Sequence, residues 1–403
     1  MSGFSSPIMR DQPIPQPLDI VIESSNYYRI AYDQSRPWLL TKGEIKKFTK
    51  GVLDVFNKLE SAFKQSVNNN QGGKLDKDFC HEQLVALAQW GRRAYQQFFD
   101  DDARKMLGEQ IRGIQQLGSQ VAPTFYSKLM LLPWEVLYEG DNYHDGDPEL
   151  FWGFRYTPAR ILMPGKSPWQ HEPFQHLPSR MLFCLNHKLR FAHAQEWPEI
   201  QKLVRFSQQD YCALLCAASC LIQGDPNIPL NERLLRNLYQ ANHNMLHFAC
   251  HCRPGKEGAD ALIISLPGSE QQVTDNEQTI ELSTYTFIDA KGKFQYSPLV
   301  FLNACESGGT VYTIFNLPVV FTEARAAAIV ATACPVPDLF AAAFARVFYE
   351  FFLKQRLPIG EALRQARWYF LKEYNNPLGL VYGLYTPAHY RLEQSPAEAI
   401  KSS

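Results

Sequence analysis

Four short apolar runs in the second half of the chain constrain its fold more than any other feature. Each is almost continuously hydrophobic, and longer segments, helical at least in part, separate one from the next. The runs are RMLFCL (180–185), NMLHFAC (244–250), LVFLNAC (299–305) and AAIVATAC (327–334). Continuous apolar strands joined by crossovers are typical of a mostly parallel sheet that helices cover on both faces. The pattern therefore predicts an α/β fold.

Polar and reactive side chains end or follow each of these runs. In chain order they are Asn186 and His187, His251 and Cys252, Cys305 and Glu306, and Asp338. Functional sites of parallel α/β folds lie at the carboxyl ends of the strands. We therefore expect a site where these residues meet.

The first half of the chain has a different pattern. The segments LDIVIES and YYRIAYD predict two strands of a hairpin joined by SSN. Helical spacing of apolar residues recurs over 42–66, 80–99 and 103–117. The stretch 163–180 is rich in proline and has no periodicity, so we interpret it as a linker. It divides the chain into 1–175 and 176–403.

The composition is that of an ordinary globular protein, with 45% hydrophobic residues, 20% charged residues and a formal net charge of −1. No cluster of Lys and Arg stands out, which argues against direct nucleic-acid binding and against docking on an anionic membrane. The amino terminus has no apolar signal segment, and no run of about 18 apolar residues occurs. We therefore expect a soluble, cytoplasmic protein.

The nine cysteines do not predict a disulfide framework, because the chain is large and carries no export signal. Cys212, Cys216 and Cys220 follow one another at intervals of four residues. This spacing predicts one stripe of a helix that packs in the core.

The segment HFACHC (247–252) holds two histidines and two cysteines, so it is a candidate metal or redox site. Side chains alternate along a strand, however, which places Cys250 and Cys252 on the face opposite His247 and His251. A structural zinc ion needs four convergent ligands, and the sequence offers no second cluster. A metal or redox module is therefore the less favoured alternative, and we expect neither a metal nor a cofactor.

Cys305 and His251 form the favoured pair. A cysteine nucleophile has an ordinary pKa near ~8.5, so it needs a partner such as histidine that exchanges protons near neutral pH. We expect the two strands that carry them to be near neighbours. The backbone N–H groups of Cys305 and Cys252 are candidates for an oxyanion hole. His247 lies deeper in its strand and is expected to pack or to orient other groups.

These motifs resemble a known family. HFACHC followed by LVFLNACESGG is similar to the CHAT-domain peptidases, which are relatives of caspases and separases. The segments LPWEVLYEG and NPLGLVYGLYTP also resemble that family, and the likeness extends from about Leu18 to Pro387. It implies that a degenerate caspase-like half, 1–175, packs on a catalytic half, 176–403. It also implies that His251 is the general base and acid and that Cys305 is the nucleophile.

The resemblance further implies a cysteine endopeptidase with a polypeptide substrate. Members of the family act in bacterial defence and regulated cell death; some cleave pore-forming gasdermins, and some are controlled by other effectors. This chain has Cys252 where the family usually has glycine after the catalytic histidine. The main alternative is therefore an inactive scaffold that binds a partner protein.

Asp338 and Glu306 are candidate substrate-binding residues. Asp338 precedes the apolar segment LFAAAFARVFYEFF, so it is a candidate N-cap of a helix. By resemblance to separases, it also occupies the position that recognises a basic P1 residue, and the two roles can coexist. Glu306 follows Cys305 directly, and either contacts the substrate or is a solvated turn residue.

Overall fold

The computed structural model describes residues 14–22, 27–30, 35–37, 41–127, 133–162, 179–204, 210–217, 225–254, 260–268, 278–304 and 316–392. Cys305 and Glu306 lie outside these ranges, as does the expected boundary near residue 175. Within the described ranges, no helix is both long enough and apolar enough to cross a membrane.

The four apolar runs form neighbouring strands. They are β6 (Arg180–Leu185), β8 (Met245–Pro254), β11 (Leu299–Ala304) and β12 (Ala328–Thr332). Their order in the sheet is β6-β8-β11-β12, and each neighbouring pair is parallel. A further parallel strand, β7 (Tyr211–Leu214), pairs with β6. The predicted parallel arrangement of these four runs is confirmed.

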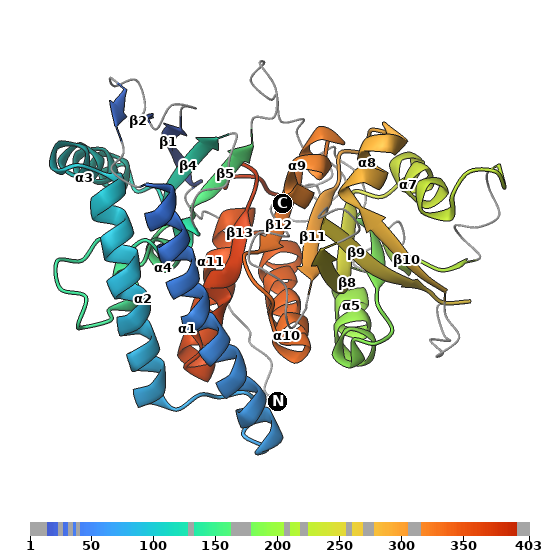
Figure 1. The fold of residues 1–403 in the computed structure, drawn as a ribbon, viewed down its shortest axis with the longest axis horizontal. Coiled ribbons are helices and arrows are strands. Elements are labelled where there is room, and N and C mark those ends of the chain that lie inside the picture. The colour runs from blue at the N-terminus through green and yellow to red at the C-terminus, as the bar shows by residue number, and fades with distance from the viewer. Residues whose placement is uncertain are drawn as a thin grey trace, which may run out of the picture.

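Strands from the rest of the chain continue this sheet and make it mixed (Figure 1). β13 (Tyr382–Leu384) runs antiparallel to β12 and parallel to β5 (Ala159–Leu162). Beyond β5 lie β4 (Val121–Ser127), β1 (Gln16–Ile22), β2 (Tyr27–Ile30) and β3 (Arg36–Pro37). β1 and β2 are antiparallel and form the predicted hairpin. The sheet is thus only partly parallel, and the division into two halves stays a prediction.

Helices cover both faces of the sheet (Figure 1). The first core includes side chains of α1 (Lys42–Asn68), α2 (Lys77–Phe98), α3 (Asp101–Gln116), α5 (Trp197–Val204), α10 (Asp338–Tyr349) and α11 (Ile359–Tyr374). The second core includes side chains of α7 (Leu230–Gln240), α8 (Thr284–Ala290) and α9 (Asn316–Glu323). The three helices expected in the first half are confirmed as α1, α2 and α3.

The side chains of β8 alternate between the two cores, as a strand requires. Cys250 and Cys252 pack in the second core. His247 instead stacks between Phe183 and Phe301, two residues of the first core. The prediction that these two cysteines face away from His247 is confirmed.

The helical stripe predicted for Cys212, Cys216 and Cys220 is wrong. Cys212 lies in strand β7, Cys216 follows the end of that strand, and Cys220 is outside the described residues. An interval of four residues also returns to the same face of a strand, because four is an even number. The spacing therefore fits both structures equally well.

Candidate active site at the ends of β8 and β11

The carboxyl end of β11 lies beside the part of β8 that carries His251. In their parallel register Ala304 lies opposite Cys250, the residue directly before His251. From His251 onward, β8 pairs antiparallel with β9 (Asp260–Leu266), so that His251 lies opposite Ile263. His251 is partly buried there. Cys305 follows Ala304 in the sequence but lies outside the described residues.

Asn186 and His187, which follow β6, hold this edge together. The backbone N–H of Asn186 donates to the carbonyl oxygen of Ala249 at 2.9 Å. Its side-chain Nδ2 donates to the carbonyl oxygen of Ile263 at 2.8 Å. His187 Nδ1 lies 2.7 Å from Ser265 Oγ. The polar residues after β6 thus connect β6 with both β8 and β9.

His247 is fully buried beneath this edge, with 0% of its surface exposed. Its ring stacks on Phe183 and Phe301, with centroid distances of 4.4 and 5.1 Å. Its Nε2 lies 2.8 Å from Glu196 Oε1, and its Nδ1 lies 3.1 Å from the Tyr349 hydroxyl. The expectation that His247 is packed within the fold is confirmed.

Two further residues complete a buried polar network that sequence reasoning missed. Asn303 Nδ2 donates to Glu196 Oε1 at 2.5 Å, and the Tyr382 hydroxyl donates to Asn303 Oδ1 at 2.7 Å. Glu196 and Asn303 are each only 1% exposed. An asparagine inside an apolar strand was a visible signal for part of this network. Glu196 had no such signal, because it lies in an irregular helical segment far from both strands in the sequence.

Asp338 does not cap its own helix, so the predicted N-cap role is wrong. It is the first residue of α10, whose N-cap is Pro337. Its carboxylate instead accepts the backbone N–H groups of Phe191 and Ala192, at 2.8 and 3.2 Å. These two residues begin the helical turn η3 (Ala192–Glu196). Asp338 therefore holds the start of a neighbouring turn, because its own backbone is already helical.

The pKa of Asp338 is raised to about 6, mainly by burial and to a smaller extent by the charge of Glu196. The two backbone N–H groups and the charge of His251 act in the opposite direction. The carboxylate thus lies within electrostatic reach of both Glu196 and His251. These effects place Asp338 beside the candidate site, although its role in substrate binding stays a prediction.

The cysteines of HFACHC are buried thiols. Burial first, and then the neighbouring Cys252 and Cys184, raise the pKa of Cys250 well above its ordinary value. Cys252 is 5% exposed. In the part of the chain that the structure describes, no three side chains of His, Cys, Asp or Glu are placed to hold a metal ion.

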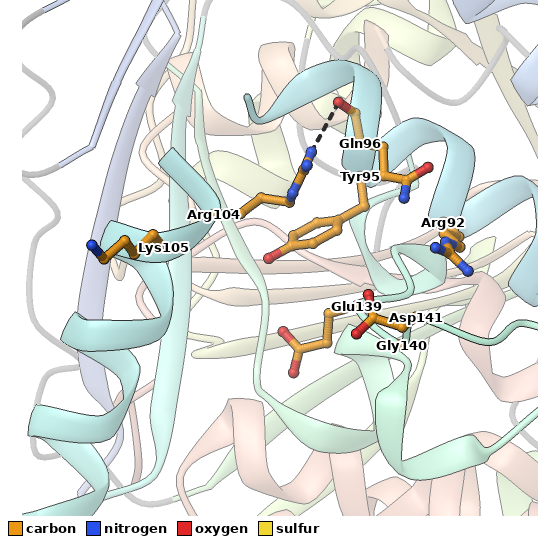
Figure 2. Close-up of a pocket in the computed structure, with 8 residues that line it drawn as sticks. All are labelled: Arg92, Tyr95, Gln96, Arg104, Lys105, Glu139, Gly140 and Asp141. Carbon is orange, nitrogen blue, oxygen red and sulfur yellow. Dashed lines mark hydrogen bonds between the residues drawn. The ribbon is translucent and has the colours of Figure 1, made fainter. Parts of the chain in front are cut away.

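A separate cavity of about 290 Å³ lies in the first half, between α2, α3 and the segment 139–141 (Figure 2). Its lining residues are Arg92, Tyr95, Gln96, Arg104, Lys105, Glu139, Gly140 and Asp141. Several of its polar groups have partners within the fold. Glu139 pairs with Arg155 and accepts from the Tyr156 hydroxyl, and Arg104 donates to the carbonyl oxygen of Phe99. The helices α2 and α3, which line this cavity, lie on the opposite side of the molecule from β8 and β11 (Figure 1).

The fold and the site thus define an α/β protein with a partly buried histidine directly after the parallel-paired part of a central strand, beside a strand that leads into a cysteine. A model of the CHAT-domain family matches residues 188–390, which is half of the chain. The chain therefore belongs to the CHAT-domain family, whose fold is caspase-like. The matched residues include His251 and Cys305.

One curated relative is a protein of Vitiosangium sp. (strain GDMCC 1.1324) that is named a probable protease. It is 26% identical over 255 residues, which cover 61% of this chain and 31% of that protein. The chain thus spans less than a third of the relative's length.

Proposed function

We propose that the protein is a cysteine endopeptidase that cleaves a polypeptide through a dyad of His251 and Cys305. One observation carries the proposal, namely the parallel register in which Cys250 lies opposite Ala304. These two residues directly precede the two members of the dyad. The CHAT-domain match and the name of the relative support peptidase chemistry.

In the proposed reaction the Cys305 thiolate attacks the scissile carbonyl carbon and forms a tetrahedral intermediate. Backbone N–H groups of Cys305 and Cys252 stabilise the oxyanion. His251 donates a proton to the leaving amine, and then removes one from the water that hydrolyses the thioester. This chemistry requires neither a metal ion nor an organic cofactor.

The position of the Cys252 side chain supports an active enzyme over an inactive scaffold. It is buried in the second core, whereas strand alternation directs His251 to the opposite face. The side chain that replaces the usual glycine therefore packs away from the face on which the dyad would act.

Asp338 and Glu306 are the proposed substrate-binding residues. A carboxylate has about four acceptor positions, and Asp338 uses two of them for the N–H groups of Phe191 and Ala192. The remaining positions suit a basic side chain at P1. Glu306 directly follows the proposed nucleophile in the sequence, which makes it the second candidate.

The wider proposal follows from the family resemblance. A degenerate half, 1–175, packs on a catalytic half, 176–403, and the protein acts in the cytoplasm in bacterial defence, under the control of a protein activator. A bacterial gasdermin is the proposed substrate. Incubation of the competent protease with a gasdermin from the same genome tests the proposed substrate. A gasdermin that stays uncleaved would contradict this proposal.

Proteolysis of an unfolded protein tests the core of the proposal. The wild-type protein is expected to cut denatured casein into discrete fragments, and Cys305→Ala and His251→Ala are each expected to stop cleavage. Cys80→Ala is the matched control, because Cys80 is a buried cysteine of α2, in the other part of the sequence. Cleavage that survives Cys305→Ala in the purified protein would contradict the proposal.

A further inference from the structure

We propose that Glu196 is a positioning residue that fixes the two strands of the dyad relative to each other. The inference rests on the proposed peptidase function and adds a residue to it. One oxygen of Glu196, Oε1, lies 2.8 Å from His247 Nε2 and 2.5 Å from Asn303 Nδ2. His247 belongs to β8 and Asn303 to β11, so a single carboxylate oxygen links the two strands.

Both linked residues come shortly before the dyad in the sequence. His247 precedes His251 by four residues, and Asn303 precedes Cys305 by two. Side chains that are four residues apart share one face of an extended strand, so His247 and His251 belong to the same face of β8. Glu196 therefore lies against the face of the sheet to which His251 points, on the amino-terminal side of the dyad.

One assignment of donors and acceptors directs the hydrogen bonds of the network toward Glu196. The Tyr382 hydroxyl donates to Asn303 Oδ1, which turns the amide NH₂ of Asn303 toward the carboxylate. Burial raises the pKa of Tyr349 well above its ordinary value, so this hydroxyl keeps its proton and can donate to His247 Nδ1. His247 then carries a proton on Nε2 and donates it to Glu196. With this assignment, each of these four hydrogen bonds has one donor and one acceptor, and all four lead to Glu196.

The carboxylate itself is held by the start of α10. Glu196 is the last residue of η3, and Asp338 accepts the N–H groups of Phe191 and Ala192 at the beginning of that turn. Tyr349, which contacts His247, ends the same helix α10. α10 therefore fixes the turn that carries Glu196 and also contacts one of the residues that Glu196 binds.

This arrangement gives Glu196 a role in reactivity and not only in folding. A nucleophile and its base must keep their mutual geometry to within a fraction of an ångström, and supporting hydrogen bonds provide that precision. Glu196 also places a charge beside the site, as its effect on the pKa of Asp338 shows. The groups around it are His247 on β8, Asn303 on β11 and Tyr349 on α10.

The rate at which Cys305 is alkylated tests the inference. The probe is a peptidyl acyloxymethyl ketone, from which the Cys305 thiolate displaces the carboxylate to leave a thioether. Rate constants are measured from pH 5 to pH 9 for the wild type, Glu196→Gln and Tyr382→Phe. Tyr138→Phe is the matched control, because Tyr138 is a buried tyrosine whose hydroxyl donates to the carbonyl oxygen of Asn142, far from the site.

Glu196→Gln and Tyr382→Phe are each expected to slow labelling by about tenfold or more, while Tyr138→Phe labels like the wild type. In Glu196→Gln the pH midpoint of labelling is also expected to fall, because removal of a negative charge favours the loss of nearby protons. A normal labelling rate and an unchanged pH midpoint in folded Glu196→Gln would overturn this inference but not the proposed function. If that variant fails to fold, a normal rate in Tyr382→Phe would overturn it. An unlabelled wild type would instead overturn the proposed function, and this inference with it.

Discussion

Ala304 on β11 and Cys250 on β8 lie opposite each other in a parallel register, at the last residue before Cys305 and before His251. Residues that lie opposite each other in a parallel pair stand at the same height of the sheet. A nucleophile and a base supplied by the next residue of each strand would therefore approach from the same edge. This pairing is the structural basis of the peptidase proposal.

The two histidines of β8 are expected to respond differently to replacement by alanine. His247→Ala leaves the buried Glu196 without one of its donors and should lower the free energy of unfolding by about 3–5 kcal/mol. His251→Ala removes a partly buried side chain and should cost much less stability, while it abolishes cleavage. Urea unfolding and casein cleavage on both variants check this. A stable His247→Ala together with an unfolded His251→Ala would contradict the assignment of His247 as the structural histidine and His251 as the catalytic one.

Asp338→Asn is expected to change how stability depends on pH. The folded protein holds the proton of Asp338 more tightly than the unfolded chain does, because burial raises its pKa to about 6. The protonated carboxyl group therefore makes its full contribution to the free energy of unfolding at pH values below its unfolded-state pKa. This contribution is lost as the pH rises toward and past 6.

Relative to the wild type, Asp338→Asn should thus gain stability between pH 4 and pH 7. The gain is on the order of 1–2 kcal/mol, reduced here because the carboxyl is partly exposed. Urea unfolding at several pH values measures it. A stability difference that stays constant with pH, or that changes in the opposite direction, would refute the expected ionisation.

The same residue is expected to set the preference at P1. Acyloxymethyl ketones that differ only in Arg, Leu or Asp at P1 should label the wild type fastest with Arg. Asp338→Ala should lose this preference while it still reacts with the Leu compound. An Arg preference that persists in a folded Asp338→Ala protein would leave Asp338 with its contacts to Phe191 and Ala192 only.

A buried ion pair is expected to contribute strongly to the stability of the fold. Glu135 of η1 (Trp134–Val136) binds Arg160 on β5 through two hydrogen bonds, and Arg367 on α11 lies 3.6 Å away. Glu135→Ala leaves both arginines buried without this partner, so it should lower the free energy of unfolding by about 3–5 kcal/mol. Urea unfolding measures this loss, and a variant as stable as the wild type would contradict it.

The continuous sheet is expected to unfold as one unit. Because β13 joins β12 to β5, we expect a single transition by calorimetry. Two separate transitions would show instead that the two halves of the sheet unfold independently.

The sequence predicted the central strands well, because a strand buried on both faces leaves a continuous apolar run. It could not predict the place of β13, whose three residues lie near the end of the chain but sit between β12 and β5. The sequence placed Asp338 correctly at the start of a helix, but it could not show that the carboxylate binds a different turn. Such contacts depend on which segments meet in space, and no local pattern records this.

The buried polar network around Glu196 also could not be predicted from local sequence patterns. Its members Glu196, His247, Asn303, Tyr349 and Tyr382 come from five elements, and the contacts among them span at least 51 residues of sequence. His247 was visible because it interrupts an apolar strand beside the candidate histidine. The role of Glu196 could be inferred only from the structure, in which it contacts both β8 and β11.

Covalent labelling of Cys305 tests the central claim most directly. The purified protein is treated with the acyloxymethyl ketone series, and its intact mass is measured for the wild type, Cys305→Ala, His251→Ala and the control Cys80→Ala. The account predicts one label on the wild type and on Cys80→Ala, none on Cys305→Ala, and strongly slowed labelling of His251→Ala. A wild-type label that remains in Cys305→Ala would move the reactive thiol elsewhere and contradict the account.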